Sequence, residues 1–180
     1  MIGELLCGDR IYLKAFEELL VSNNAYHSED YAWQMLVDKP VGWALLERPE
    51  YDYANCVVLT ENRCPAYQLT LLDKEPLGLL DLRSLHAVVP ALNAISAGQT
   101  VYPRVTTPLT KVERLTLHLL SRGHHNKEIA AKRKVSESTV KNSLYEIYKK
   151  LNLKTRVEAT HYYLGNWHLL DNWQRPGHLL

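Results

Sequence analysis

Residues 136–151 repeat an apolar side chain at intervals of four, three and four positions. The apolar positions are Val140, Leu144, Ile147 and Leu151. This spacing returns to the same side of an α-helix on every turn, so it predicts an amphipathic helix with one buried stripe. Ser136 comes just before the repeat, where a hydroxyl can accept a hydrogen bond from a free backbone N–H. The pattern therefore predicts a capped helix that buries one face and leaves the other outside.

Three more helices are expected around this one. Thr110 and Glu113 form the S/T-x-x-E capping box, so a helix should begin there and end at Gly123. A short helix should cover residues 126–133, and a fourth should open near residue 154. The apolar residues of these helices are Val112, Leu115, Leu119, Leu120, Ile129, Ala130, Val157, Ala159, Tyr162 and Tyr163. A short helix, a turn and a second helix with a polar outer face is the helix-turn-helix arrangement.

Charge is distributed unevenly along the chain. Of its 180 residues, 21 are Lys or Arg and 20 are Asp or Glu, a net charge of only +1. Residues 1–105 have 8 basic and 14 acidic side chains, a net of −6, whereas residues 106–166 have 12 and 5, a net of +7. This asymmetry indicates an acidic module joined to a basic one. The expected divisions are a regulatory domain over residues 1–98, a proline-containing linker over 99–108, a basic domain over 109–166 and a tail over 167–180.

Composition narrows the class of protein. Hydrophobic residues make up 46% and charged residues 23%, which favours a folded chain over a disordered one. No apolar run approaches the roughly 20 residues of a membrane helix, and the start lacks the pattern of a secretory signal, so a cytoplasmic protein without membrane association is expected. The three cysteines form no CxxC pair, and His124 beside His125 makes a poor chelating face. No catalytic motif is found, so no enzyme activity, metal or cofactor is expected.

The side of the 136–151 helix opposite its apolar stripe is polar and cationic. It carries Ser138, Lys141, Asn142, Tyr145, Lys149 and Lys150. Lysine can meet phosphates or guanine acceptors, asparagine can pair with adenine, and a hydroxyl can reach a phosphate. The pattern alone leaves two interpretations open: a surface that binds DNA, or a solvated amphipathic face of the kind that most charge runs form.

The same residues carry a resemblance to a known family. Residues 109–159, about a third of the chain, closely resemble the LuxR/FixJ-type helix-turn-helix of bacterial transcription regulators. The matching positions are Leu109, Thr110, Glu113, Gly123, the block 126–130, Ser136, the block 139–141, Lys150, Leu151 and Arg156. Ser143 departs from the family, which often has histidine there. This difference bears on a backbone contact or on site preference, and not on the fold.

The resemblance implies a DNA-binding transcriptional regulator whose 136–151 helix enters the major groove. The residues implied to contact DNA are Lys127, Ser138, Thr139, Lys141, Asn142, Tyr145 and Lys149. Among them, Lys141, Asn142 and Tyr145 are implied to lie nearest the base edges. Lys127, Thr139 and Lys149 are implied to contact phosphates.

The resemblance also implies partners. The family's usual dimer surface is its last helix, here about residues 157–164, so a homodimer on an inverted repeat of double-stranded DNA is implied. Tyr162 and Tyr163 can equally serve packing inside the domain. RNA polymerase or another regulator is a further implied partner, and the DNA-bound protein would be nucleoid-associated. The alternative, kept open by Ser143 and the N-terminal half, is a co-regulator or antagonist that heterodimerises with another regulator without reading DNA.

The acidic half alternates short apolar segments with amphipathic ones. Strands are expected over residues 3–7, 41–47, 55–61 and 76–81. Helices are expected over residues 11–21, 28–36 and 85–97, the last interrupted by Pro90 and ended by Gly98. Alternation of this kind predicts a parallel sheet with flanking helices.

This order resembles a response-regulator receiver, the usual partner of such a DNA-binding domain. The expected fold is therefore an atypical flavodoxin-like α/β receiver, followed by an all-α four-helix LuxR-type domain. Receivers transfer a phosphoryl group to an aspartate, using paired acids for Mg²⁺, a Thr or Ser and a Lys. The corresponding positions here are Asp9, Glu47, Thr60 and Asp81. A single acid follows the first strand, and Asp81 replaces the lysine with a group that repels phosphate, so a pseudo-receiver outside phosphorylation control is implied.

Three side chains of this half have competing interpretations. Glu47, placed where the acceptor aspartate would fall, either imitates the phosphorylated state or is a surface glutamate at a strand end. Cys56 and Cys64 are either redox-sensing or buried structural cysteines. A module of this kind is expected to serve dimerisation, ligand sensing or partner docking.

Overall fold

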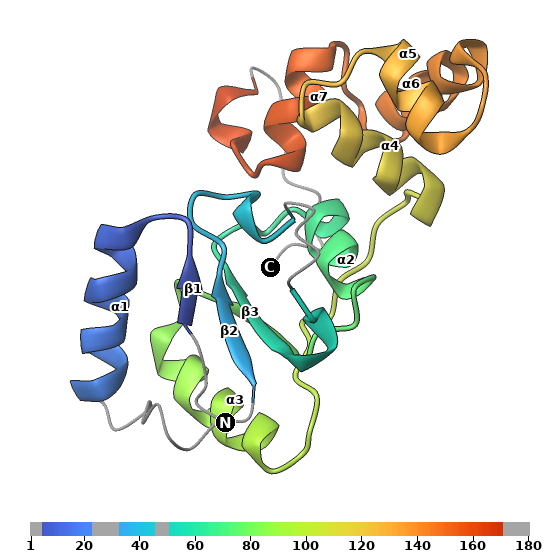
Figure 1. The fold of residues 1–180 in the computed structure, drawn as a ribbon. Helices are drawn as coiled ribbons and strands as arrows, with labels where there is room; N and C mark the ends of the chain where they lie inside the picture. The colour runs from blue at the N-terminus through green and yellow to red at the C-terminus, as the bar shows by residue number, and fades with distance from the viewer. Residues whose placement is uncertain (1–4, 23–32, 46–50, 171–180) are drawn as a thin grey trace. The chain divides into compact units, whose positions relative to one another are not determined.

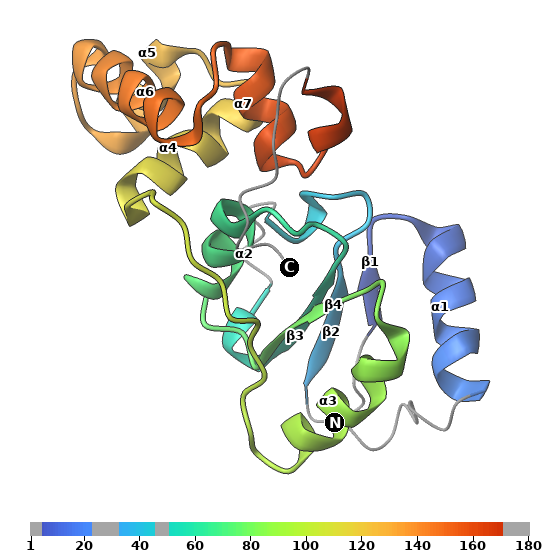
Figure 2. The ribbon, with the colours of Figure 1, turned by 180° about the vertical axis from the view of Figure 1, so that it is seen from behind.

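The computed structural model describes residues 5–22, 33–45 and 51–170 (Figures 1 and 2). The chain divides into two compact units. The first comprises residues 1–63 and 71–105, and the second comprises residues 64–70 and 106–180. Within the described ranges, no helix is both long enough and apolar enough to cross a membrane.

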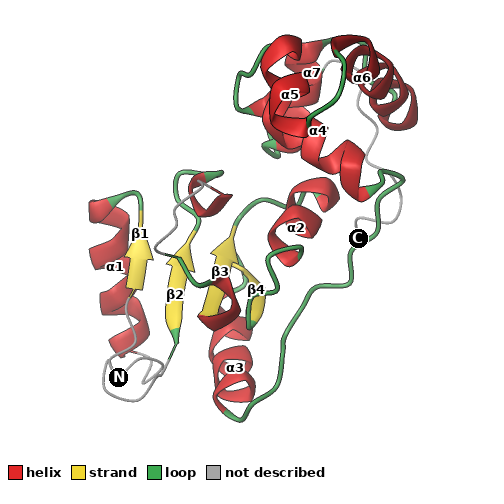
Figure 3. Ribbon diagram, turned by 45° about the vertical axis from the view of Figure 1, so that its right-hand side comes forward, coloured by secondary structure: helices red, strands yellow, loops and turns green. Residues whose placement is uncertain are grey.

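The first unit is built on four parallel strands (Figure 3). The strands lie side by side in the order β1 (Leu5–Cys7), β2 (Gln34–Val37), β3 (Cys56–Thr60) and β4 (Gly78–Asp81). Leu6 pairs with Leu36, Leu36 with Val58, and Val58 with Leu79 across the sheet. Every residue of β3 is buried, as expected of a parallel strand that is covered on both faces.

Two helices pack into one core against this sheet. They are α1 (Arg10–Ser22) and α3 (Leu85–Ser96). The core consists mainly of Phe16, Leu20, Met35, Val57, Leu59, Leu80, Val88, Leu92 and Ile95. Its strand residues alternate along each strand, so they point to a single face of the sheet. Gly78 permits this packing, because a Cβ there would lie only 2.6 Å from Ile95 Cδ1.

The described strands follow the order of a doubly wound receiver, except that one edge strand is not among them. A flavodoxin-like sheet has the order 2-1-3-4-5. Here β1 and β2 are neighbours, so the four strands correspond to 1-3-4-5 of that order. The second strand of the pattern is not found among the described residues, and residues 23–32 lie outside them. The predicted receiver-like α/β fold, a parallel sheet with flanking helices, is confirmed.

The strand expected over residues 41–47 is wrong in its described part. The chain forms a turn there and then the 3-10 helix Trp43–Leu45. Asp38 is the reason, because its Oδ1 accepts hydrogen bonds from the backbone N–H groups of Gly42 at 3.0 Å and Ala44 at 2.9 Å. These bonds fold the segment back onto the end of β2. Residues 46 and 47 lie outside the described part of the chain.

Helix prediction in the acidic half is also partly wrong. The helix expected over residues 28–36 is, where it is described, the start of β2, because a short apolar run suits a buried strand as well as a helix. Conversely, no pattern predicts α2 (Pro65–Leu72), whose polar and apolar residues do not separate onto two faces. α3 continues through Pro90 without a break, and α1 forms as expected.

The second unit contains the four predicted helices. They are α4 (Lys111–Ser121), α5 (Asn126–Arg133), α6 (Glu137–Leu151) and α7 (Arg156–Tyr163), followed by a 3-10 turn, Trp167–Leu169. The capping box of α4 is formed as expected: the Thr110 hydroxyl accepts from Glu113 N, and the Glu113 carboxylate accepts from Thr110 N at 2.8 Å. Gly123, with φ of 85°, ends α4 in the left-handed region that glycine adopts without strain.

The helices share a buried interior. Its members include Leu117, Leu119, Leu120, Ile129, Val140, Leu144, Ile147, Leu153, Ala159, Tyr162 and Tyr163. Three of the apolar positions grouped with these helices from the sequence face outward instead: Val112, Leu115 and Val157 are 53%, 46% and 64% exposed. Val112 and Leu115 therefore form an exposed apolar site on α4, and Val157 forms a second one on α7.

Candidate nucleic-acid interface

α5 and α6 are joined by a tight turn that fixes the direction of α6. Lys134 ends α5 in a left-handed conformation with φ of 54°, and Val135 N then donates to Ala130 O at 3.0 Å. Ser136 begins the next helix, because its Oγ accepts from Thr139 N at 3.1 Å. Ile129 of α5 and Val140 of α6 are completely buried beneath this turn. The outer face of α6 is therefore held by a cap and by the core below it.

All seven residues predicted to contact DNA are exposed on this helix pair. Lys127 lies on α5, and the others, Ser138, Thr139, Lys141, Asn142, Tyr145 and Lys149, lie on α6. The buried side chains of α6 are Val140, Leu144 and Ile147, so the polar side chains occupy the opposite face. Tyr145 is 66% exposed although its ring is large and largely apolar.

Three hydroxyls gather at the N-terminus of α6. Ser136 Oγ lies 2.8 Å from both Ser138 Oγ and Thr139 Oγ1. Free backbone N–H groups and the positive end of the helix dipole favour an anion at such a position. Ser138 and Thr139 therefore lie at the end of α6 that favours an anion.

Lys141 has an acidic neighbour that the sequence interpretation did not include. Its Nζ lies 3.4 Å from Glu137 Oε1, one helical turn earlier, and both side chains are largely exposed. The i, i+4 spacing of the two residues is the signal that identifies such a pair in a sequence. An exposed pair of this kind contributes little stability, so Lys141 can leave Glu137 for a stronger anion.

Other cations of the domain are used for support. Lys150 Nζ lies 2.8 Å from both carboxylate oxygens of Glu113 and thereby ties α6 to α4. Burial raises the pKa of Glu113, but hydrogen bonds from Lys150 and Thr110 outweigh it, so the pKa is lowered overall. The carboxylate is therefore charged at neutral pH, and Lys150 is placed for a structural role.

Two arginines brace the helices in the same way. Arg156 of α7 donates to Asn126 Oδ1 at 3.3 Å and to the carbonyl of His124, which fixes the start of α5. Arg133 at the end of α5 donates to Thr116 Oγ1 of α4 at 2.7 Å. The positions shared with the LuxR type thus include residues that hold α6 in place as well as residues on its outer face.

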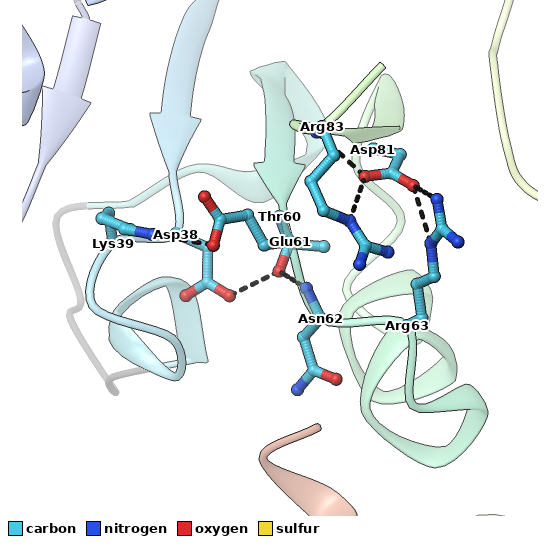
Figure 4. Close-up of polar contacts among 8 residues, drawn as sticks. All are labelled: Asp38, Lys39, Thr60, Glu61, Asn62, Arg63, Asp81 and Arg83. Atoms are coloured by element: carbon cyan, nitrogen blue, oxygen red, sulfur yellow. Dashed lines mark hydrogen bonds and ion pairs between the residues drawn. The ribbon is translucent and has the colours of Figure 1, made fainter. Parts of the chain in front are cut away.

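A second polar cluster lies at the carboxyl edge of the sheet in the first unit (Figure 4). Asp38 directly follows β2 and is completely buried. Its Oδ2 accepts from Thr60 Oγ1 at 2.8 Å, while its Oδ1 accepts the two backbone N–H groups described above. Thr60 Oγ1 in turn accepts from Asn62 N at 3.1 Å. Both oxygens of this carboxylate are therefore occupied by hydrogen bonds from the chain itself.

The strand that was expected to end at Glu47 is not formed in its described part, and the strand that does form there, β2, ends earlier in the chain. β2 lies between β1 and β3, and the acid that directly follows it is Asp38. Glu47 lies outside the described residues, so the structure does not place it. Thr60 is the last residue of β3 and Asp81 the last residue of β4. The structure brings Thr60 to Asp38, an aspartate that the sequence interpretation missed because it assigned the strand too late.

Asp81 is surrounded by arginines (Figure 4). Its Oδ2 accepts from Arg63 Nη2 at 2.8 Å and Nε at 3.0 Å, and its Oδ1 accepts from Arg83 N at 3.0 Å and Nε at 3.3 Å. The carboxylate therefore serves as the anchor of two guanidinium groups at the end of β4. A lysine in a receiver would instead present its charge to a phosphoryl group.

The remaining charged groups of this edge are also engaged. Asp9 Oδ1 accepts from Ile11 N at 2.9 Å and Tyr12 N at 3.0 Å, and thus caps α1. Lys39 Nζ lies 2.7 Å from Glu61 Oε2, and this hydrogen bond raises the pKa of Lys39. Among the described residues, no group of three or more His, Cys, Asp and Glu side chains has the arrangement of a metal site.

Two cysteines of the chain are buried. Burial raises the pKa of Cys56 to about 11 and that of Cys64 to about 12. Both are therefore protonated thiols at neutral pH, and thiols react with oxidants far more slowly than thiolates. The structural interpretation of these cysteines is favoured.

Comparison with known proteins agrees with this geometry. Residues 107–163 match the family described as bacterial regulatory proteins, luxR family. The nitrate/nitrite response regulator protein NarL of Escherichia coli K12 is 38% identical over 101 residues, which cover 49% of this chain and 46% of NarL. The chain thus matches about half the length of this curated relative.

Solved structures give weaker likenesses. Two RcsB dimers bound to two parallel DNAs include a chain that is 18% identical, with a TM-score of 0.47, covering 91% of this chain and 98% of that one. RcsB from Salmonella enterica serovar Typhimurium, bound to promoter rprA, is 16% identical, with a TM-score of 0.47, covering 92% and 100%. Together, the family match, the NarL similarity and the capped helix-turn-helix show that residues 107–163 form a helix-turn-helix domain similar to that of the luxR family of bacterial regulatory proteins.

Proposed function

We propose that this protein is a sequence-specific transcriptional regulator that inserts α6 into the major groove of double-stranded DNA. The observation that carries the proposal is the outer face of α6, which is polar, cationic and exposed on a helix fixed by its cap and core. Lys141, Asn142 and Tyr145 face the base edges in this proposal. Lys127, Ser138, Thr139 and Lys149 contact phosphates. The regulator works in the bacterial cytoplasm and is nucleoid-associated when it is bound to DNA.

Binding of the full chain to DNA tests this function. Fluorescence anisotropy with a labelled pool of random-sequence duplexes, at two salt concentrations, measures affinity and its salt dependence. A protein that contacts several phosphates binds the pool and loses affinity steeply as salt rises. Absence of binding at low salt contradicts the proposal and favours a co-regulator that heterodimerises with another regulator without reading DNA.

We also propose that the regulator is a homodimer on an inverted repeat, formed through the exposed side of α7. Tyr162 and Tyr163 are 4% and 1% exposed, and the Tyr163 hydroxyl lies 3.3 Å from His118 Nδ1. Packing inside the domain is thus the use favoured for both tyrosines. Val157, at 64% exposed, supplies an apolar contact at the start of α7.

Replacing Val157 by aspartate is expected to weaken the dimer at least about tenfold, because each subunit would bury a carboxylate in place of an apolar side chain. Sedimentation equilibrium of the full chain measures this dissociation. Val112→Asp is the matched control, since Val112 is 53% exposed on α4 and lies outside the proposed contact. Equal effects of the two substitutions would contradict a dimer through α7.

We further propose that phosphorylation does not control this regulator. Both oxygens of Asp38 accept hydrogen bonds from buried groups, and the carboxylate is closed to solvent. Asp81 holds two arginines where a receiver uses a lysine. RNA polymerase or another regulator is then the partner through which the first unit acts.

Incubation with acetyl phosphate and Mg²⁺ is expected to leave the intact mass of the protein unchanged. A buried carboxylate whose oxygens are both occupied offers no free nucleophile, and the neighbouring acid Asp9 is used to cap α1. Mass spectrometry of the native protein measures the outcome, and Asp38→Asn serves as the control that cannot form an acyl phosphate. A phosphoryl adduct on the wild type that the control lacks contradicts the proposal.

A further inference from the structure

Several side chains on the outer face of α6 have no partner among the described residues. Asn142 and Tyr145 are exposed, and no hydrogen bond or ion pair engages either of them within the ranges that the structure describes. Ser138 is hydrogen-bonded to the helix cap, and Lys141 is paired with Glu137. Asn142, Tyr145 and Lys149 can thus bind without first breaking a contact, and of these three only Asn142 and Tyr145 are uncharged.

Their spacing suits neighbouring base pairs. Three residues of an α-helix advance about 4.5 Å along the axis, close to the roughly 3.4 Å step between base pairs. The two side chains lie about 60° apart around α6 at 3.6 residues per turn, on either side of the line opposite the buried stripe. A helix lying in the major groove with its buried stripe turned away therefore directs both of them at base edges.

Their chemistry selects one kind of base pair. The asparagine amide offers one acceptor and one donor side by side, which matches the amino group and N7 of adenine. The tyrosine ring is apolar along its edge, and the apolar group in the major groove is the methyl group of thymine. Neither side chain has the cationic fork or ammonium group that guanine prefers.

We propose that Asn142 reads an adenine and Tyr145 contacts the thymine methyl group of an adjacent base pair, so each half-site has A·T pairs beneath the centre of α6. This inference rests on the proposed DNA-binding function and specifies what that surface reads. The tyrosine hydroxyl is not needed for the methyl contact, which leaves the aromatic ring as the specificity-determining part.

Selection from a random duplex pool with the full chain tests the proposal. Wild type, Asn142→Ala, Tyr145→Ala and Tyr145→Phe are each used to enrich a motif. Affinities are then measured on the wild-type motif with thymine replaced by deoxyuridine, or adenine by 7-deaza-adenine. Deoxyuridine is expected to cost the wild type and Tyr145→Phe roughly fourfold in affinity, the value of one buried methyl group, and to cost Tyr145→Ala nothing. Asn142→Ala is expected to lose roughly 5- to 150-fold and to become insensitive to 7-deaza-adenine.

The experiment distinguishes failure of the base assignment for Asn142 and Tyr145 from failure of the proposed DNA-binding function. If the wild type enriches a motif with adjacent A·T pairs in each half-site and the variants lose their own base preference, the inference holds. If the wild type enriches a motif but the alanine variants retain it unchanged, the inference fails while DNA binding stands. If the wild type enriches no motif, the proposed function fails, and the inference fails with it. Thermal unfolding of each variant verifies that these exposed substitutions leave the fold intact.

Discussion

Replacing Asp38 by alanine is expected to lower the free energy of unfolding of the first unit by about 3 kcal/mol or more. The carboxylate is completely buried and accepts three hydrogen bonds, from Gly42 N, Ala44 N and the Thr60 hydroxyl. Alanine leaves these donors without their acceptor, and each unsatisfied buried donor costs about 1–3 kcal/mol. The turn after β2 and the contact from β2 to β3 depend on this one side chain, so the loss is expected to be cooperative.

Hydrogen exchange detected by mass spectrometry measures this effect in the full chain. Peptides that cover β2 and β3 should exchange faster in Asp38→Ala, whereas peptides from α4 to α7 report the second unit separately. Asp81→Asn is the matched control, because Asp81 also lies at the carboxyl edge of the sheet but its partners are half-exposed arginines, and such pairs are worth about 1 kcal/mol or less. If both substitutions destabilise β2 and β3 equally, Asp38 does not have the structural role assigned to it.

The second unit could be predicted from the sequence because its signals are local. The α4 capping box spans only Thr110 to Glu113, and the apolar stripe of α6 repeats within one helix. Caps and periodicity of this kind act between residues three or four positions apart, so they can be found without knowing the fold. The outward turn of Val112 and Val157 could not be predicted in this way, because it depends on which sides of α4 and α7 meet the other helices.

The first unit was harder to predict because its decisive contacts are distant in sequence. Asp38 and Thr60 are 22 positions apart and meet only because β2 and β3 are neighbours. The apolar segment ending at Val37 is short enough to suit either a helix or a buried strand, and without β2 the strand was assigned to residues 41–47 instead. The acid that directly follows β2 is Asp38, whereas Glu47, the residue chosen from the sequence, lies outside the described residues. The Glu137–Lys141 pair, in contrast, was available from its i, i+4 spacing alone.

Opposite changes in DNA affinity are expected when the two members of that pair are replaced. Lys141→Ala should weaken binding by about 1–3 kcal/mol, because it removes a contact to a base edge. Glu137→Gln should strengthen binding by about 0.5 kcal/mol, since it releases Lys141 and removes a negative charge beside the DNA. In the free protein Lys141 Nζ lies 3.4 Å from Glu137 Oε1, and this ion pair must break before Lys141 contacts DNA. Glu137→Gln removes that small free-energy cost of binding.

Anisotropy titrations of the full chain at several salt concentrations measure both changes. Lys74→Ala is the control for total charge, because it removes one exposed lysine from the first unit and leaves α6 untouched. If only the total charge of the chain determined DNA affinity, Lys74→Ala and Lys141→Ala would weaken binding equally. That result would contradict the assignment of α6 to the major groove. Opposite signs for Glu137→Gln and Lys141→Ala are expected if this turn of α6 lies against the DNA, because exposed charges interact mainly within about one Debye length, roughly 10 Å.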